Sequence, residues 1–140
     1  MQVFSLLRPL KKYNHYVERA ALYESLFMRR KAMETMKRAV LQPFAEKEIA
    51  SGLVYLGMLS LKLKSHRQAL DYFDQALEMV LEEPFNYSSN ISKIMEAFIQ
   101  YGDKERALYW LRQLLEKQSY DRRFKKLEKY MDLLTDPKRK

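Results

Sequence analysis

Apolar residues recur at three- and four-residue spacing along almost the whole chain, with polar residues between them. Such spacing places the apolar side chains on one face of a helix. It predicts seven amphipathic helices, in residues 14–27, 32–40, 53–63, 69–80, 91–98, 107–115 and 119–134. In the first of them the apolar face comprises Val17, Ala20, Tyr23 and Phe27.

Residues that stop or start helices separate these stretches. Pro43 and Pro84 end the second and fourth helices, because proline cannot continue a helix. Ser65 and Gln68 fit a capping box at the start of the fourth helix. Gly102 fits the left-handed position after the fifth helix, and Asp103 can cap the sixth. Consecutive helices therefore form hairpins.

Three of the predicted helices repeat the same small-residue spacing. Their leading alanines, Ala32, Ala69 and Ala107, lie 37 and 38 residues apart. A period of this length is typical of stacked helical hairpins. Small residues such as Gly57 and Ala69 let two helix axes approach closely, and Phe73 fills the space beside them.

This pattern resembles the tetratricopeptide repeat (TPR). The middle copy, residues 50–83, has the family's residue types at Leu53, Leu56, Gly57, Ala69, Phe73 and Ala76. The third copy keeps Tyr101, Gly102, Asp103 and Ala107, but has Met95 where the family has a small residue. The first copy keeps Ala20, Tyr23, Ala32 and Ala39. The spacing exceeds the family's usual period, and Pro84 follows Ala69 at a greater distance than Pro43 follows Ala32, so the fourth helix should be about a turn longer.

The resemblance implies an all-α fold, a right-handed α-solenoid of about three TPR-like hairpins with a C-terminal capping helix. Residues 1–12 would pack on the first repeat as an N-terminal segment. Residues 13–118 would form the repeats, at about 13–46, 47–86 and 87–118. Residues 119–134 would be the capping helix, and residues 135–140 a basic tail.

Composition narrows the range of functions. The chain has no cysteine, which excludes disulfides and thiolate metal sites. It has two histidines, His15 and His66, in separate repeats, and only three glycines. No phosphate-binding loop or hydrolase motif occurs. We therefore expect neither an enzyme nor a bound cofactor or metal.

Net charge is +8 and lies mainly at the two ends. Residues 1–42 carry a net +6 and residues 117–140 a net +5, whereas residues 43–116 carry a net −3. Basic residues beside aromatic ones in the last helix could contact nucleic acid. A solvated capping helix explains them better, so nucleic acid is not the expected partner. Apolar runs are far shorter than the roughly 20 residues of a membrane span, and a cytoplasmic location is the default expectation.

The TPR resemblance also implies a concave groove lined by the first helix of each hairpin. Transferred onto this sequence, the groove residues are Asn14, Val17, Ala21, Ser51, Val54, Tyr55, Met58, Lys62, Ser89, Ser92, Lys93 and Glu96. In the middle of the groove, Val54, Tyr55 and Met58 form an apolar patch. This patch is either a partner site or is covered by the chain's own N-terminal segment or by a second copy. Of the side chains with which some TPR proteins clamp a chaperone's C-terminal carboxylate, only Lys93 has a counterpart.

Two hypotheses of function follow. The first is a TPR-like adaptor that binds a peptide or protein segment in its groove. The second is a self-associating structural module, such as a homodimer, whose groove is filled by the chain itself. Longer repeats of this kind are similar to those in the peptide-sensing regulators of Gram-positive bacteria, and the second hypothesis extends to a part of such a regulator.

Overall fold

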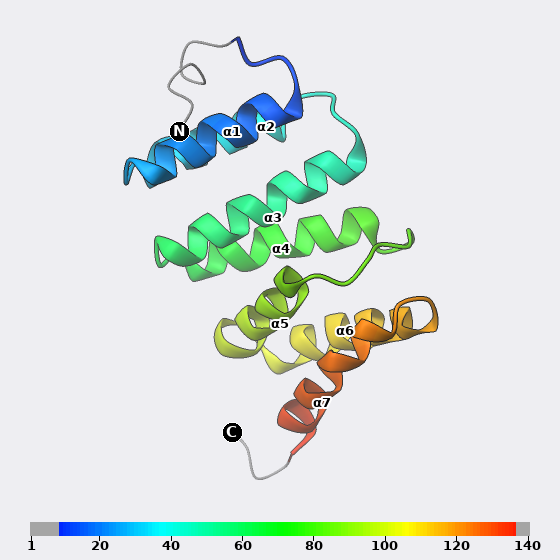
Figure 1. Cartoon of the computed structure of the whole chain (residues 1–140). Helices are drawn as coiled ribbons and strands as arrows, with labels where there is room; N and C mark the ends of the chain where they lie inside the picture. The colour runs from blue at the N-terminus through cyan, green and yellow to red at the C-terminus, as the bar shows by residue number, and fades with distance from the viewer. Residues whose placement is uncertain (1–8, 137–140) are drawn as a thin grey trace. The chain divides into compact units, whose positions relative to one another are not determined.

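The computed structural model describes residues 9–136 and shows seven α-helices and no strand among them (Figure 1). The helices are α1 (Tyr13–Ser25), α2 (Arg29–Ala39), α3 (Glu46–Lys62), α4 (His66–Val80), α5 (Ser89–Tyr101), α6 (Lys104–Leu115) and α7 (Glu128–Thr135). Two short 3₁₀ segments, η2 (Glu116–Ser119) and η3 (Arg122–Leu127), lie between α6 and α7. The predicted all-α class is confirmed. The chain forms two compact units that divide after Val80.

The first unit contains α1 to α4, and each helix packs on the next. Its core consists of the faces that the apolar spacing predicts, together with Tyr16, Ala50 and Leu59. The central cluster is Tyr16, Ala20, Ala32, Met33, Met36, Ala39, Ala50, Leu53, Leu56, Leu59 and Ala76. As predicted, α4 is about a turn longer than α2, with 15 residues against 11.

The two hairpin turns of this unit share one C-terminal capping geometry. After α1, the backbone N–H of Met28 donates to the carbonyl of Tyr23, and that of Phe27 donates to the carbonyl of Glu24. After α3, Ser65 and Lys64 donate to Ser60 and Leu61 in the same way. This pair of backbone hydrogen bonds is the Schellman motif, in which the residue after the C-cap adopts the left-handed conformation. Phe27 (φ 61°) and Lys64 (φ 64°) occupy that position.

Two predictions at helix ends are wrong. Phe27 was expected on the buried face of the first helix, but α1 ends at Ser25 and Phe27 is 91% exposed in the turn. Gly102 was expected in the left-handed conformation, but it is extended, with φ −102° and ψ −175°. The chain leaves α5 directly into the cap of α6, where Asp103 accepts a bond from the N–H of Arg106 as predicted.

The second unit contains α5, α6, η2, η3 and α7. Its fully buried large side chains are Phe98, Ile94, Met95, Trp110, Leu111, Leu114, Phe124 and Leu127. The capping helix predicted over residues 119–134 is only partly formed. An α-helix starts at Glu128, and η3 precedes it. The chain turns at residues 119–121 because Tyr120 and Asp121 bind the segment that enters α5.

Several predicted segments extend beyond the described residues. Leu10 packs against the core of the first unit, whereas residues 1–8 of the predicted N-terminal segment lie outside the described part of the chain. The predicted basic tail likewise lies outside it from residue 137 onward. Over the described residues, no helix combines the length and apolar character that crossing a membrane requires.

Candidate functional site

A polar cluster links α1 to α3 on the face where the sequence places the groove. The hydroxyl of Tyr55 donates to Oε2 of Glu24 over 3.2 Å. Nζ of Lys62 lies 3.3 Å from Oε1 of the same carboxylate. Glu24 therefore binds two side chains of α3 at once and fixes the two helices against each other.

Both tyrosines near this face keep their protons at neutral pH. Burial raises the pKa of the Tyr55 hydroxyl, and the nearby Glu24 carboxylate raises it further. Burial also raises the pKa of Tyr13, although a side-chain hydrogen bond with Ser51 opposes the shift. The protonated hydroxyl of Tyr55 acts here as the hydrogen-bond donor that joins α3 to α1.

The predicted groove residues of the first unit differ in exposure. Asn14, Ala21, Ser51 and Lys62 are exposed. The others, Val17, Val54, Tyr55 and Met58, are half-buried. Val17, Val54 and Tyr55 pack against the central cluster, so each contributes one side to the core and one to the surface.

In the second unit, α7 binds part of the predicted groove face. The hydroxyl of Tyr130 lies 2.8 Å from Oγ of Ser92 and donates to Oε1 of Glu96 over 2.8 Å. Ser89 and Lys93 of the same helix are exposed. The C-terminal helix thus binds Ser92 and Glu96 through Tyr130, although Glu96 remains exposed. The sequence gives no signal for this contact, because Tyr130 lies 38 residues from Ser92.

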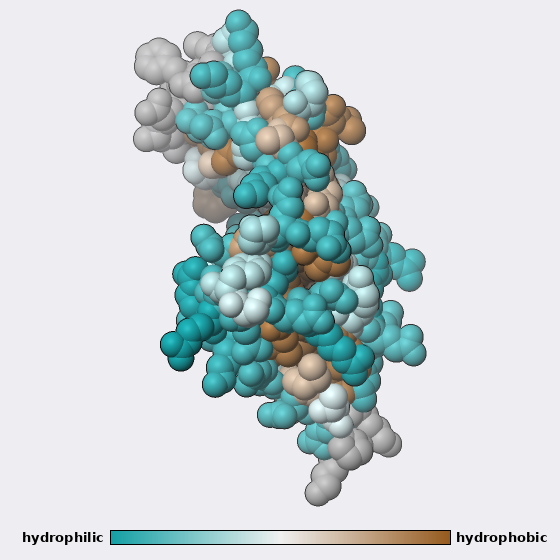
Figure 2. Space-filling model, turned by 90° about the vertical axis from the view of Figure 1, so that its right-hand side faces the viewer, coloured by the Kyte–Doolittle hydropathy of each residue, from teal (hydrophilic) through white to brown (hydrophobic). Residues whose placement is uncertain are grey.

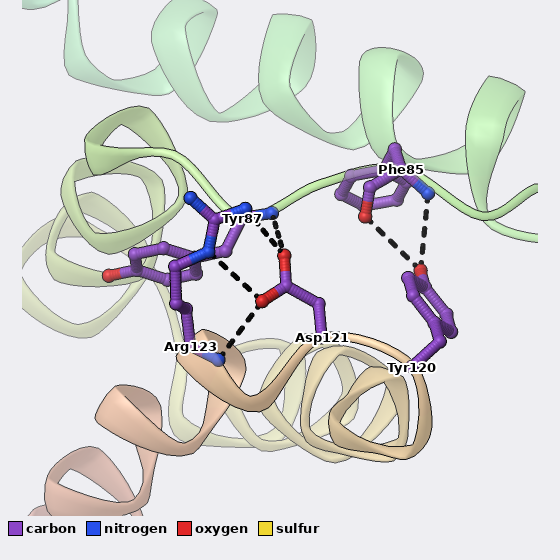
Figure 3. Close-up of polar contacts among 5 residues, drawn as sticks. All are labelled: Phe85, Tyr87, Tyr120, Asp121 and Arg123. Atoms are coloured by element: carbon purple, nitrogen blue, oxygen red, sulfur yellow. Dashed lines mark hydrogen bonds and ion pairs between the residues drawn. The ribbon is translucent and has the colours of Figure 1, made fainter.

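The basic residues of η3 and α7 are partly engaged within the second unit. Arg123 forms a 2.9 Å ion pair with Asp121 (Figure 3). Nζ of Lys126 lies 5.6 Å from the ring centre of Tyr87, and Nζ of Lys129 lies 5.1 Å from that of Tyr130. Cations over aromatic rings stabilise the fold. These contacts agree with the interpretation of this segment as a cap.

Asp121 binds the backbone of the segment that leads into α5. Its Oδ2 accepts the backbone N–H of Tyr87 over 2.9 Å, and its Oδ1 accepts the N–H of Arg123 over 3.0 Å. Beside it, the hydroxyl of Tyr120 lies 3.2 Å from both the backbone nitrogen and the carbonyl oxygen of Phe85 (Figure 3). The Arg123 side chain and the Tyr87 N–H hold the pKa of the Asp121 carboxyl far below its ordinary value.

The buried side chain of Lys117 also binds the segment that precedes α5. Lys117 is buried, and its Nζ donates to the carbonyls of Leu81 (2.9 Å) and Glu83 (3.2 Å). The ring centre of Phe85 lies 4.5 Å from the same nitrogen. The role of Lys117 is therefore structural, and its sequence position among charged residues gives no hint of burial.

Among residues 9–136, no three His, Cys, Asp or Glu side chains are arranged to hold a metal ion. His15 has a capping role, because its Nδ1 accepts from the backbone N–H groups of Lys11 and Lys12 at the start of α1. On the face shown in Figure 2, hydrophilic side chains predominate and hydrophobic areas lie among them.

No protein-family model matches the chain, and comparison with curated proteins and with solved structures gives no significant match.

Proposed function

We propose that this chain is a TPR-like interaction module whose first unit binds a peptide or protein segment along the face shared by α1 and α3. The supporting observation is a pair of contacts between these helices. The ring edge of Tyr13 lies beside Gly52 near one end, and Glu24 binds Tyr55 and Lys62 near the other. Val17 and Ala21 of α1, and Val54 and Met58 of α3, lie between the two contacts.

The α1–α3 surface between these two contacts has the composition of a binding site. Half-buried Val54 and Met58 offer apolar area, and the exposed Ala21 has a side chain too small to cover it. Polar groups stand at both ends, with Asn14 and Ser51 at one and Lys62 at the other. An apolar centre with a polar rim is the usual anatomy of a protein–protein interface. The TPR resemblance places the ligand face on the same helices.

Site-directed crosslinking tests this proposal. A photo-crosslinking residue at Ala21 of the full chain should trap a partner polypeptide in cell lysate, which mass spectrometry then identifies. The purified partner should bind the chain in solution, and Met58→Glu should weaken that binding. Met58 lies outside the central cluster, so the urea midpoint should stay close to that of the unmodified chain.

Gln75→Glu is the matched control, because it adds the same charge at an exposed position of α4. It should leave binding unchanged. If the only crosslinked product is a second copy of the chain, and sedimentation gives a dimer mass, the self-association hypothesis replaces the adaptor. If nothing is trapped and the chain stays monomeric, the proposed face is not a binding site.

A further inference from the structure

The turn between α1 and α2 exposes three consecutive apolar side chains. Leu26 is 44% exposed, Phe27 91% and Met28 37%. Phe27 also adopts the left-handed backbone conformation, with φ 61°. Bulky residues are disfavoured there, and glycine is the usual choice in this kind of cap.

Nothing in the packing compensates for this choice, because the Phe27 ring is almost wholly solvent-exposed. Phe27 therefore combines two unfavourable features, an exposed large apolar side chain and a left-handed backbone conformation. Such conflicts concentrate at functional sites. The equivalent turn after α3 places Lys64 in the same conformation, so the geometry of the turn does not require an aromatic residue.

Cations surround this apolar tip. Arg29, Arg30 and Lys31 follow it directly in sequence and are all exposed. Nζ of Lys31 lies 5.8 Å from the ring centre of Tyr23, which keeps this cation beside the turn. The acid nearest to the turn in sequence, Glu24, is already bound by Lys62 and Tyr55.

The turn after α3 adds to the same basic surface. The ion pair between Glu24 and Lys62 brings the C-terminal ends of α1 and α3 together. Both hairpin turns of the first unit therefore lie at one edge, where Figure 1 shows them at the left. Exposed Lys64 and Arg67 extend the positive charge sideways from the tip.

We infer that this edge of the first unit docks on an anionic lipid surface, with the Phe27 side chain entering the interface. The apolar residues form the apex and the cations stand behind them, which matches the order of hydrocarbon and phosphate in a bilayer. A protruding apex with charge spread sideways suits a broad, deformable surface better than a closed pocket. The inference is independent of the α1–α3 face, which uses other residues.

The expected attachment to the membrane is reversible, and it depends on both the apolar tip and the cations. A short apolar insertion or a few cations alone gives only weak membrane binding, whereas the two together reinforce each other. Binding should therefore require anionic lipid and should weaken as salt screens the cations.

Vesicle sedimentation with the full chain tests the inference. Vesicles of phosphatidylcholine with a minority of phosphatidylglycerol should bind the chain at low salt, and pure phosphatidylcholine vesicles should bind it much less. Phe27→Gly should lower the partition coefficient roughly tenfold, since it removes the apolar apex. This variant suits the left-handed backbone, so a loss of binding cannot be attributed to unfolding.

Two further variants complete the design. Arg29→Gln with Arg30→Gln should lower binding to anionic vesicles by roughly tenfold or more. Leu41→Ala removes another exposed apolar side chain, 82% exposed in the turn after α2, and should leave binding unchanged.

Absence of binding to anionic vesicles at low salt overturns the inference, as does binding that Phe27→Gly leaves intact. Equal binding to neutral and anionic vesicles would refute the role of the cations. If the chain instead binds a purified acidic protein through Phe27 and fails to bind vesicles, the tip is a protein contact and the lipid proposal is wrong.

Discussion

The aromatic ring of Phe73 in α4 lies directly against Gly57 in α3. A Cβ atom at residue 57 would lie 2.6 Å from Cδ1 and 2.8 Å from Cζ of that ring, and closer still to Cε1. Carbon atoms do not approach this closely, so α3 and α4 can pack at their present separation only because residue 57 is glycine. Phe73 is fully buried, which leaves its ring no space to withdraw.

We therefore expect Gly57→Ala to destabilise the first unit, by roughly 1–3 kcal/mol for an overpacked contact. Urea unfolding followed by circular dichroism measures the change. Gly57→Ala combined with Phe73→Leu should recover part of the loss, because the smaller side chain makes room. At Gly52, an added Cβ would meet only the end of the Val40 side chain at 2.9 Å, so Gly52→Ala should lose less. Equal losses at both glycines would contradict the proposed role of the ring.

The sequence alone predicted this contact, because its signal is local. Gly57 and Phe73 belong to neighbouring helices with strong apolar periodicity. Their spacing resembles that of the small and large residues in the tetratricopeptide pattern. The same periodicity placed Ala32, Ala69 and Ala107 in the core, and all three are fully buried. It placed Phe27 there as well, and that prediction is wrong. Periodicity cannot show that α1 ends at Ser25, two residues before Phe27.

The three turn positions Phe27, Lys64 and Gly102 are equivalent in the repeat, since each lies five residues before its leading alanine. The first two are left-handed without being glycine, and the one glycine is not left-handed. Phe27→Gly and Lys64→Gly should each raise stability by up to about 1 kcal/mol, because they relieve the unfavourable backbone conformation.

Gly102→Ala provides the opposite test. The extended backbone at residue 102 accepts any side chain, and alanine restricts the unfolded chain, so stability should hold or rise by about 0.4–1 kcal/mol. Thermal unfolding of the three variants measures these changes. A clear loss of stability in Gly102→Ala would indicate a left-handed glycine after all.

The contacts of the second unit were harder to predict. Lys117, Tyr120 and Asp121 each bind backbone groups 34 to 36 residues away in sequence. Their partners are carbonyl and amide groups, which every residue carries, so no sequence pattern marks them. For the same reason, the engagement of Ser92 and Glu96 by Tyr130 could not be predicted from the residues of α5.

Replacement of Lys117 by methionine tests its structural role. Methionine keeps much of the side-chain volume but removes the donor that satisfies the carbonyls of Leu81 and Glu83. We expect a loss of roughly 1–3 kcal/mol, because two hydrogen bonds from a buried charged donor are lost. Lys125→Met, at an exposed position of η3, is the control and should change the urea midpoint little. If both variants behave alike, the two carbonyls are satisfied by water and Lys117 is dispensable.

The ionised carboxylate of Asp121 should make the stability of the chain depend on pH. The pKa of Asp121 is lowered in the folded chain by Arg123 and by the Tyr87 N–H, so the folded state favours the ionised carboxylate. A group of this kind contributes stability that is fully present above its unfolded pKa, near 4 for an aspartate, and that is lost as pH falls below that value. The free energy of unfolding should therefore decrease as pH falls below about 4.

Unfolding free energies of the chain and of Asp121→Asn, measured from neutral pH down to about pH 2, test this expectation. Asparagine can still accept the Tyr87 N–H but cannot form the ion pair with Arg123. The variant should thus be less stable at neutral pH, and the difference should shrink below about pH 4, where the Asp121 carboxylate of the unfolded wild-type chain becomes protonated. Asp132→Asn, at an exposed position of α7, controls for the loss of one negative charge. A difference between Asp121→Asn and the wild-type chain that stays constant across this range would show that the carboxylate acts only as a hydrogen-bond acceptor, and not through its charge.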